Sequence, residues 1–160
     1  MTTSQQFCTF FLDGSLFGVP VPQVQEVIRF HEMTGVPLAP EVVEGMINLR
    51  GQIVIAIDLR RRLLLRARGQ GELPVNVVIR TADSAVSLLV DEIGDVVEVQ
   101  DSSFEAPPET LRGALRSMIL GVHKLEGHLL HVLDPEKACQ IHSSPESVGT
   151  SSAGNATLSA

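Results

Sequence analysis

The sequence predicts an all-β protein with short helices, assembled as a duplicated pair of small β-barrels. Two observations within residues 45–60, and one repeat of them, predict this fold class. The first is an apolar strand, a tight turn at Arg50-Gly51, and a second strand, Ile53–Ile57, that is apolar throughout. The second is Asp58, a residue type that commonly caps a helix, after which Leu59–Leu65 can continue as a short helix. Strand, glycine turn, buried strand and capped helix together form one corner of a barrel.

The same corner recurs near the end of the chain. When segment 125–135 is aligned with segment 49–59, Gly127 falls beneath Gly51 and Asp134 beneath Asp58. A second repeat, at a similar spacing, relates segment 17–28 to segment 86–97. Both spacings are too long for a solenoid repeat, and they suit a duplicated small barrel.

The remaining elements follow from apolar runs bounded by turn residues. In the first half we expect a strand, a hairpin turn, its partner strand, and a short helix or a helical turn that runs into a strand: Phe7–Leu12, Asp13-Gly14, Ser15–Val19 and Val21–Phe30. A glycine-rich stretch from Ala67 to Leu73 marks a mobile loop. In the second half we expect a hairpin about Asp83-Ser84, three further strands and a terminal helix: Val75–Thr81, Ala85–Val90, Gly94–Val99, Ser117–His123, Gly127–Leu133 and Asp134–Ile141.

The composition limits the class of protein. The net charge of −7 disfavours a general binder of nucleic acid or of anionic membranes. No apolar run approaches the ~20 residues that span a bilayer, and residues 1–6 lack a basic flank, so we expect a cytoplasmic protein. Cys8 and Cys139 stand far apart, and we expect both to be reduced and semi-buried.

Several of these pieces, in this order, resemble the CheW family of bacterial chemotaxis coupling proteins. The resemblance rests on a Phe-x-Leu-Asp-Gly-x-x-Phe-Gly-Val start and on five later motifs: Val24-Gln25-Glu26-Val27, Gly45-Met46-Ile47-Asn48-Leu49-Arg50-Gly51, Ile57-Asp58-Leu59-Arg60, Leu89-Val90-Asp91 and Asp95-Val96. It covers residues 7–141. The chain departs from the family in two places: Ser87 stands where members usually carry Gly, and the basic segment Arg60–Arg68 is not a family signature.

The resemblance implies two pseudo-symmetric, five-stranded SH3-like barrels that share a core. We expect one CheW-like domain at 7–141, with lobes at about 7–68 and 74–141 that can exchange strands. Residues 142–160 are rich in Ser, Gly, Thr and Ala, and we expect them to form a disordered tail.

The resemblance also implies a non-enzymatic adaptor without cofactors, which bridges the cytoplasmic tip of a methyl-accepting chemoreceptor and the regulatory domain of a CheA-type histidine kinase. We expect such a protein to associate with receptor arrays at the inner membrane. We place a kinase contact at the central turn, around four residues: Gly45, Asn48, Arg50 and Gly51. A receptor tip is a helical hairpin that needs an apolar groove, and the seam between the barrels is the candidate, lined by Val24, Val27, Ile28 and Val96.

Two charges stand out because their surroundings are apolar. Glu26 lies in a segment that we interpret as helical, and Arg50 sits at the turn of a buried hairpin. We hypothesise that they form an ion pair that braces the helix against the hairpin, and that losing one partner costs more than breaking a surface pair. Two separately solvated charges are the alternative.

Other functions find weaker support. An SH3-like module that binds RNA or another acidic partner through Arg60–Arg68 is one alternative, although a solvated helix face with Arg60, Arg61 and Arg62 outward explains the arginines more simply. Asp83-Ser84-Ala85 resembles the aspartic-protease triplet without its glycine, which leaves a small hydrolase as a third candidate. His123, His128 and His131 do not form a metal site, since strand residues 128 and 131 point to opposite faces, and we expect surface histidines.

Overall fold

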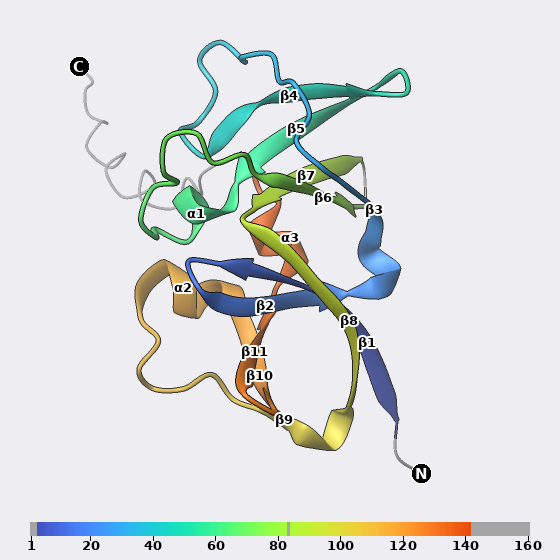
Figure 1. Ribbon diagram of the computed structural model, residues 1–160, viewed down its shortest axis with the longest axis vertical. Coiled ribbons are helices and arrows are strands. Elements are labelled where there is room, and N and C mark those ends of the chain that lie inside the picture. Colours follow the sequence, from blue (N-terminus) through green and yellow to red (C-terminus); the bar gives the residue numbers. More distant parts are fainter. Residues whose placement is uncertain (1–2, 83, 142–160) are drawn as a thin grey trace, which may run out of the picture.

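The computed structural model describes residues 3–82 and 84–141, which form two β-sheets, one above the other in Figure 1. Most of the described residues lie in strands, and the helices are short. None of the described helices is long and apolar enough to cross a membrane. The elements in chain order are β1 Ser4–Leu12, β2 Ser15–Pro20, η1 Val21–Gln23, β3 Val24–Ile28, β4 Val43–Leu49, β5 Gln52–Asp58, α1 Leu59–Arg62, β6 Val75–Arg80, β7 Ala85–Val90, β8 Glu92–Gln100, η2 Asp101–Ser103, β9 Phe104–Glu105, α2 Gly113–Met118, β10 Ile119–Leu125, β11 His128–Leu133 and α3 Pro135–Ala138.

The two halves of the chain exchange hairpins. The upper sheet has the order β3-β6-β7-β5-β4, and the lower sheet has the order β8-β1-β2-β11-β10-β9. The hairpin β1–β2 therefore joins the strands of the second half, and β6–β7 joins those of the first. We call the upper sheet with α1 lobe B, and the lower sheet with α3 lobe A. Strands therefore exchange between the lobes, as the expectation allowed, so neither lobe is one continuous segment such as 7–68 or 74–141.

The duplication expected from the sequence is present in the strand order. Read from one edge, β3-β6-β7-β5-β4 matches β8-β1-β2-β11-β10, and β5 pairs in parallel with β7 as β11 does with β2. Both corners carry the expected cap: Asp58 accepts a hydrogen bond from the backbone N–H of Arg60 at 3.1 Å, and Asp134 accepts one from Glu136 at 3.1 Å. The lower sheet adds only the two-residue strand β9 to the expected five.

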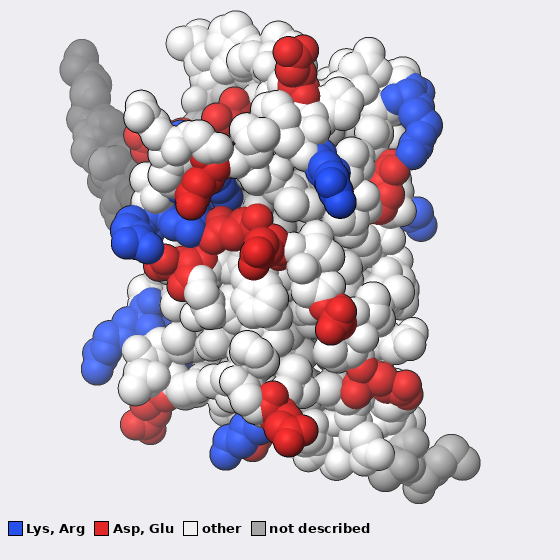
Figure 2. Space-filling model, in the orientation of Figure 1, with Lys and Arg blue, Asp and Glu red and all other residues white. Residues whose placement is uncertain are grey.

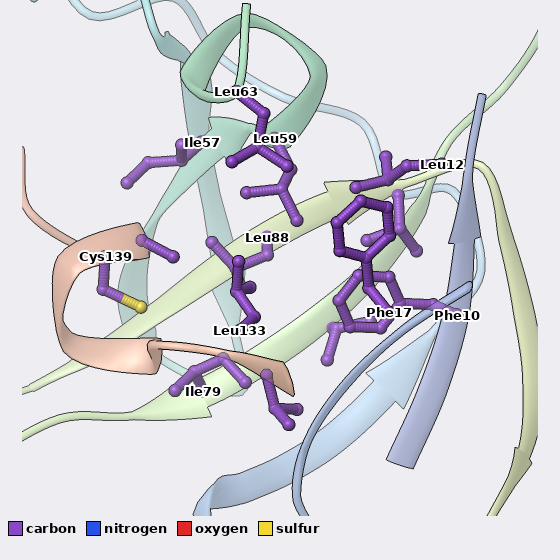
Figure 3. Packing of buried hydrophobic residues seen from close by; sticks show 14 of the residues in the cluster. Phe10, Leu12, Phe17, Ile57, Leu59, Leu63, Ile79, Leu88, Leu133 and Cys139 are labelled. Carbon is purple, nitrogen blue, oxygen red and sulfur yellow. The ribbon is translucent and has the colours of Figure 1, made fainter. Parts of the chain in front are cut away.

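The lobes share a core. A central cluster of buried side chains takes Phe10 and Phe17 from lobe A and Leu88 from lobe B, and it continues through Leu59 and Cys139 (Figure 3). Each sheet also has a smaller cluster on its other face. Both cysteines are buried free thiols, as expected.

Local differences from the sequence predictions have simple causes. Val21–Phe30 contains only one 3-10 turn before β3, so the second of the two expected alternatives is correct and Glu26 lies on a strand. The helix expected at Leu59–Leu65 ends at Arg62, because Leu64 adopts a left-handed φ of 58° that a helix cannot continue. The expected turn residue Asp83 and the expected tail at 142–160 lie outside the described residues.

Ser87, the departure from the family pattern, is fully buried in β7. Its hydroxyl donates to the side-chain oxygen of Asn76 on β6 at 2.8 Å, and Asn76 in turn donates to the carbonyl of Arg29 at 3.3 Å. A buried hydroxyl is tolerated when it is hydrogen-bonded, so the protein accommodates serine here with a matching amide.

Candidate functional site

The β4–β5 hairpin projects beyond the rest of lobe B (Figure 1). Its two turn residues have positive φ, 54° at Arg50 and 88° at Gly51, which is the geometry of a tight two-residue hairpin. The side-chain oxygen of Asn48 accepts a hydrogen bond from the backbone N–H of Gly51 at 2.8 Å and holds the turn. Arg50 is consequently presented to solvent, with 73% of its side chain exposed.

The structure brings Arg50 and Glu26 together in a two-pronged contact. Nη1 and Nη2 of Arg50 donate to the two carboxylate oxygens of Glu26 at 2.8 and 2.6 Å. These hydrogen bonds lower the pKa of Glu26 and raise that of Arg50. Because β3 and β4 are the two edges of their sheet, the pair connects the edges of lobe B. The partner element is a strand instead of the expected helix. With 73% of the Arg50 side chain exposed, the contact is a surface ion pair, a kind that ordinarily contributes about 0–1 kcal/mol.

Gly45 does not lie at the turn. It is a buried residue near the start of β4, opposite Ala56, where the segment before β4 crosses over the hairpin. Thr34 and Met46 exchange two backbone hydrogen bonds there, at 2.9 and 2.8 Å. A Cβ on Gly45 would stand 2.8 Å from the carbonyl oxygen of Thr34, so this glycine permits a close backbone crossing.

The four apolar residues expected at the seam divide into two pairs. Val24 and Ile28 pack against the central cluster and the lobe B cluster, respectively. Val27 and Val96 are 41% and 58% exposed and lie on β3 and β8, the pseudo-equivalent edge strands of the two lobes. Each is paired with a residue of the central cluster, Val77 for Val27 and Cys8 for Val96, so both valines lie on the core-facing side of their sheets.

The arginine segment is not an outward-facing stripe. Arg60 is buried, and its guanidinium donates to Asp91 at 2.9 and 2.6 Å, so the expectation that it points outward is wrong. Arg68 lies 3.5 Å from Asp58 and 3.3 Å from Asp91. Arg61 and Arg66 are exposed but also pair with carboxylates, at 3.3 Å from Glu44 and 3.0 Å from Asp13. Arg62 was expected to point outward as well, but its Nε and Nη2 are buried. Four of the five arginines of the segment therefore pair with carboxylates, which disfavours RNA binding through Arg60–Arg68. Asp91 and Asp58 were not predicted as partners of arginine, although both follow buried strands in the sequence.

His123 also differs from its prediction as a surface residue. It is 3% exposed, lies between Phe7 and Phe104, and has Nδ1 2.7 Å from the hydroxyl of Ser103. Burial lowers its pKa. Within residues 3–82 and 84–141, no three His, Cys, Asp or Glu side chains gather closely enough to hold a metal ion. Asp83, the residue on which a hydrolase was considered, is not among the described residues.

The fold and this site define a class: a two-lobed β scaffold with a projecting hairpin, pseudo-symmetric edges and a shared core, suited to contacts with other proteins. The CheW-like domain profile matches residues 6–141, and the chain belongs to this family.

Relatives with known names agree with this assignment. The chain is 32% identical over 136 residues to the chemotaxis protein CheW of Treponema pallidum, covering 82% of this chain and 80% of the relative. It is 30% identical over 146 residues to the chemotaxis protein CheW of Bacillus subtilis, covering 91% and 94%. The crystal structure of the scaffolding protein TtCheW from Thermoanaerobacter tengcongensis superimposes with a TM-score of 0.74 at 27% identity, covering 82% of this chain and 89% of that one.

Proposed function

We propose that this chain is a non-enzymatic adaptor that couples a methyl-accepting chemoreceptor to a CheA-type histidine kinase in a chemosensory array. The observation that carries the proposal is the family match across nearly all described residues, together with a hairpin end that is exposed. The kinase, the receptor and an array position at the inner membrane are parts of this proposal.

The proposed kinase contact is the end of the β4–β5 hairpin. Asn48 and Gly51 fix the turn, Arg50 is exposed there, and Glu26 orients its guanidinium. A fixed and exposed arginine is a suitable interface anchor because its planar group loses little freedom on binding. Gly45 acts indirectly, because its lack of a side chain lets the segment around Thr34 pack closely against β4.

The proposed receptor contact is the seam between β3 and β8. The exposed Val27 and Val96 supply apolar area from lobe B and lobe A. The half-buried Val24 and Ile28 attach β3 to the buried clusters. A helical hairpin that lies along the seam would bury both exposed valines.

The kinase contact is tested by titrating the regulatory domain of a CheA-type kinase from the same genome with wild-type protein and with Arg50→Ala. We expect micromolar binding that weakens about tenfold or more, as for an interface anchor. Arg112→Ala, an exposed arginine in the other lobe, is the matched control and should bind as the wild type does. Equal binding by Arg50→Ala and wild type would remove the hairpin from the interface, and absence of wild-type binding to any such kinase would refute the adaptor.

The receptor contact is tested with a receptor-tip fragment and Val96→Lys. The added charge should weaken receptor binding and leave kinase binding unchanged, because β8 belongs to the other lobe. Leu120→Lys, at an aliphatic residue of β10 with similar exposure, is the control. A Val96→Lys protein with wild-type receptor affinity would place the receptor elsewhere.

A further inference from the structure

The carboxylate of Asp91 joins three segments of the chain. Asp91 lies between β7 and β8, where the chain passes from lobe B to lobe A. It accepts hydrogen bonds from the backbone N–H of Asp13 at 2.8 Å, from Nε and Nη2 of Arg60 at 2.9 and 2.6 Å, and from Nη2 of Arg68 at 3.3 Å. Asp13 is in the β1–β2 turn of lobe A, Arg60 is in α1 of lobe B, and Arg68 is in the loop between α1 and β6.

Arg66 adds further hydrogen bonds to this contact between the lobes, which we call the Asp91 junction. Nη1 of Arg60 donates to the carbonyl of Arg66 at 2.7 Å, and Nη2 of Arg66 donates to the carboxylate of Asp13 at 3.0 Å. Blue and red side chains meet on the left of Figure 2, at the level where α1 approaches the β1–β2 turn in Figure 1. Burial disfavours the charged form of Asp91, yet the hydrogen bonds from Arg60 and Asp13 and the charges of Arg60 and Arg68 outweigh it and lower its pKa. The carboxylate is therefore ionised where the lobes meet.

The duplicated fold provides an internal comparison. The two alignments that relate the halves of the chain place Pro22 at the position equivalent to Asp91, and Glu136 at the position equivalent to Arg60. A proline and a glutamate cannot form this contact. The second corner nevertheless has the same strands, the same Asp cap and the same short helix. The ion pair of Asp91 with Arg60 is thus not needed to build a corner. Among the described residues, it is present at one of the two corners related by the duplication and absent from the other.

We propose that Asp91 is a positioning residue that fixes the orientation of the two lobes and thereby aligns the two halves of the receptor-binding seam. This inference rests on the proposed function. Val27 is on lobe B and Val96 on lobe A, so the seam exists as one surface only when the lobes keep their relative orientation. The proposed kinase contact is built from β3, β4 and β5 of a single lobe and does not depend on that orientation.

The test compares Asp91→Asn with Glu92→Gln, which removes one negative charge from the exposed neighbouring residue. We expect Asp91→Asn to weaken binding of a receptor-tip fragment about fivefold or more, the range of ordinary coupling between sites, and to change affinity for the kinase regulatory domain less than twofold. Glu92→Gln should match the wild type in both. Equal losses for receptor and kinase would indicate general destabilisation and would overturn the inference, as would unchanged receptor binding.

A second measurement needs no partner. Residual dipolar couplings of the wild-type protein should fit one alignment tensor for both lobes, and those of Asp91→Asn should need two. A single tensor in Asp91→Asn refutes the positioning role, whatever the binding results. If the wild type binds neither partner, the proposed function fails while the tensors still decide the inference. Asp91→Glu, which keeps the charge opposite Arg60 but moves it by one methylene, serves if Asp91→Asn does not fold.

Discussion

The close crossing at Gly45 makes a quantitative prediction about stability. In Gly45→Ala, the new methyl group would stand 2.8 Å from the carbonyl oxygen of Thr34 and 3.0 Å from Cβ of Met33, so the backbone of the crossing segment must move. Overpacking of this kind costs about 1–3 kcal/mol. Moving the segment also weakens the two hydrogen bonds between Thr34 and Met46, each worth about 1 kcal/mol. We therefore expect the free energy of unfolding to fall by about 2–4 kcal/mol, which lowers Tm by about 5–15 °C for a chain of this size.

The assay is urea and thermal unfolding of Gly45→Ala beside Gly35→Ala. At Gly35 an added methyl group would meet no atom within 4 Å, and the residue has no left-handed φ, so its substitution should leave stability unchanged or slightly raised. The duplicated position gives a second check. Gly121 lies beneath the ring of Phe104 and the carbonyl of Glu105, so Gly121→Ala should destabilise the protein at least as strongly. A Gly45→Ala protein as stable as Gly35→Ala would refute the close approach of the Thr34 segment to Gly45.

Loss of kinase binding in a Gly45 variant should accordingly be interpreted as damage to the hairpin before it is assigned to a lost contact.

Three further predictions concern buried groups. Burial lowers the pKa of His123 in the folded protein, so the unfolded chain takes up the proton first as pH falls below about 6.5, and stability should decrease there. His123→Ile introduces the side chain found at the equivalent position, Ile47, and the urea midpoints of this variant should lose the pH dependence. An unchanged pH dependence would contradict the burial of His123. Ser87→Gly, the residue expected from the family resemblance, should lower stability by about 2–3 kcal/mol, because it leaves the buried oxygen of Asn76 unpaired and adds backbone freedom to the unfolded chain. A variant that is more stable in urea unfolding would show that the hydrogen bond from Ser87 to Asn76 does not stabilise the fold. Burial raises the pKa of Cys139 to about 12, so a thiol reagent at pH 8 should label Cys139 only in denaturant, and rapid labelling of the native protein would show that α3 opens.

Much of the fold was predictable because its signals are local. The corner at 49–59 needs only a glycine at the turn, an apolar strand and an aspartate that reaches the next N–H groups, and all of these lie within a few residues of one another. The repeat of that corner at 125–135 then predicts a duplicated barrel. The Glu26–Arg50 pair was named from sequence, yet its strand context and its exposure were not, because one 3-10 turn shifts Glu26 from a helix to an edge strand.

The sequence by itself determined the family, the duplicated strand–turn–strand–helix corners and the residues of the hairpin turn, since each depends on neighbours along the chain. Only the tertiary structure decided that the halves exchange hairpins, that Gly45 lies under a crossing segment, and that Arg60 is buried against Asp91. These features join residues far apart in the chain, such as Arg60 with Asp91 and Asp13. Periodicity and capping carry no information about which distant segments meet, because that choice is made by the packing of whole sheets around a shared core.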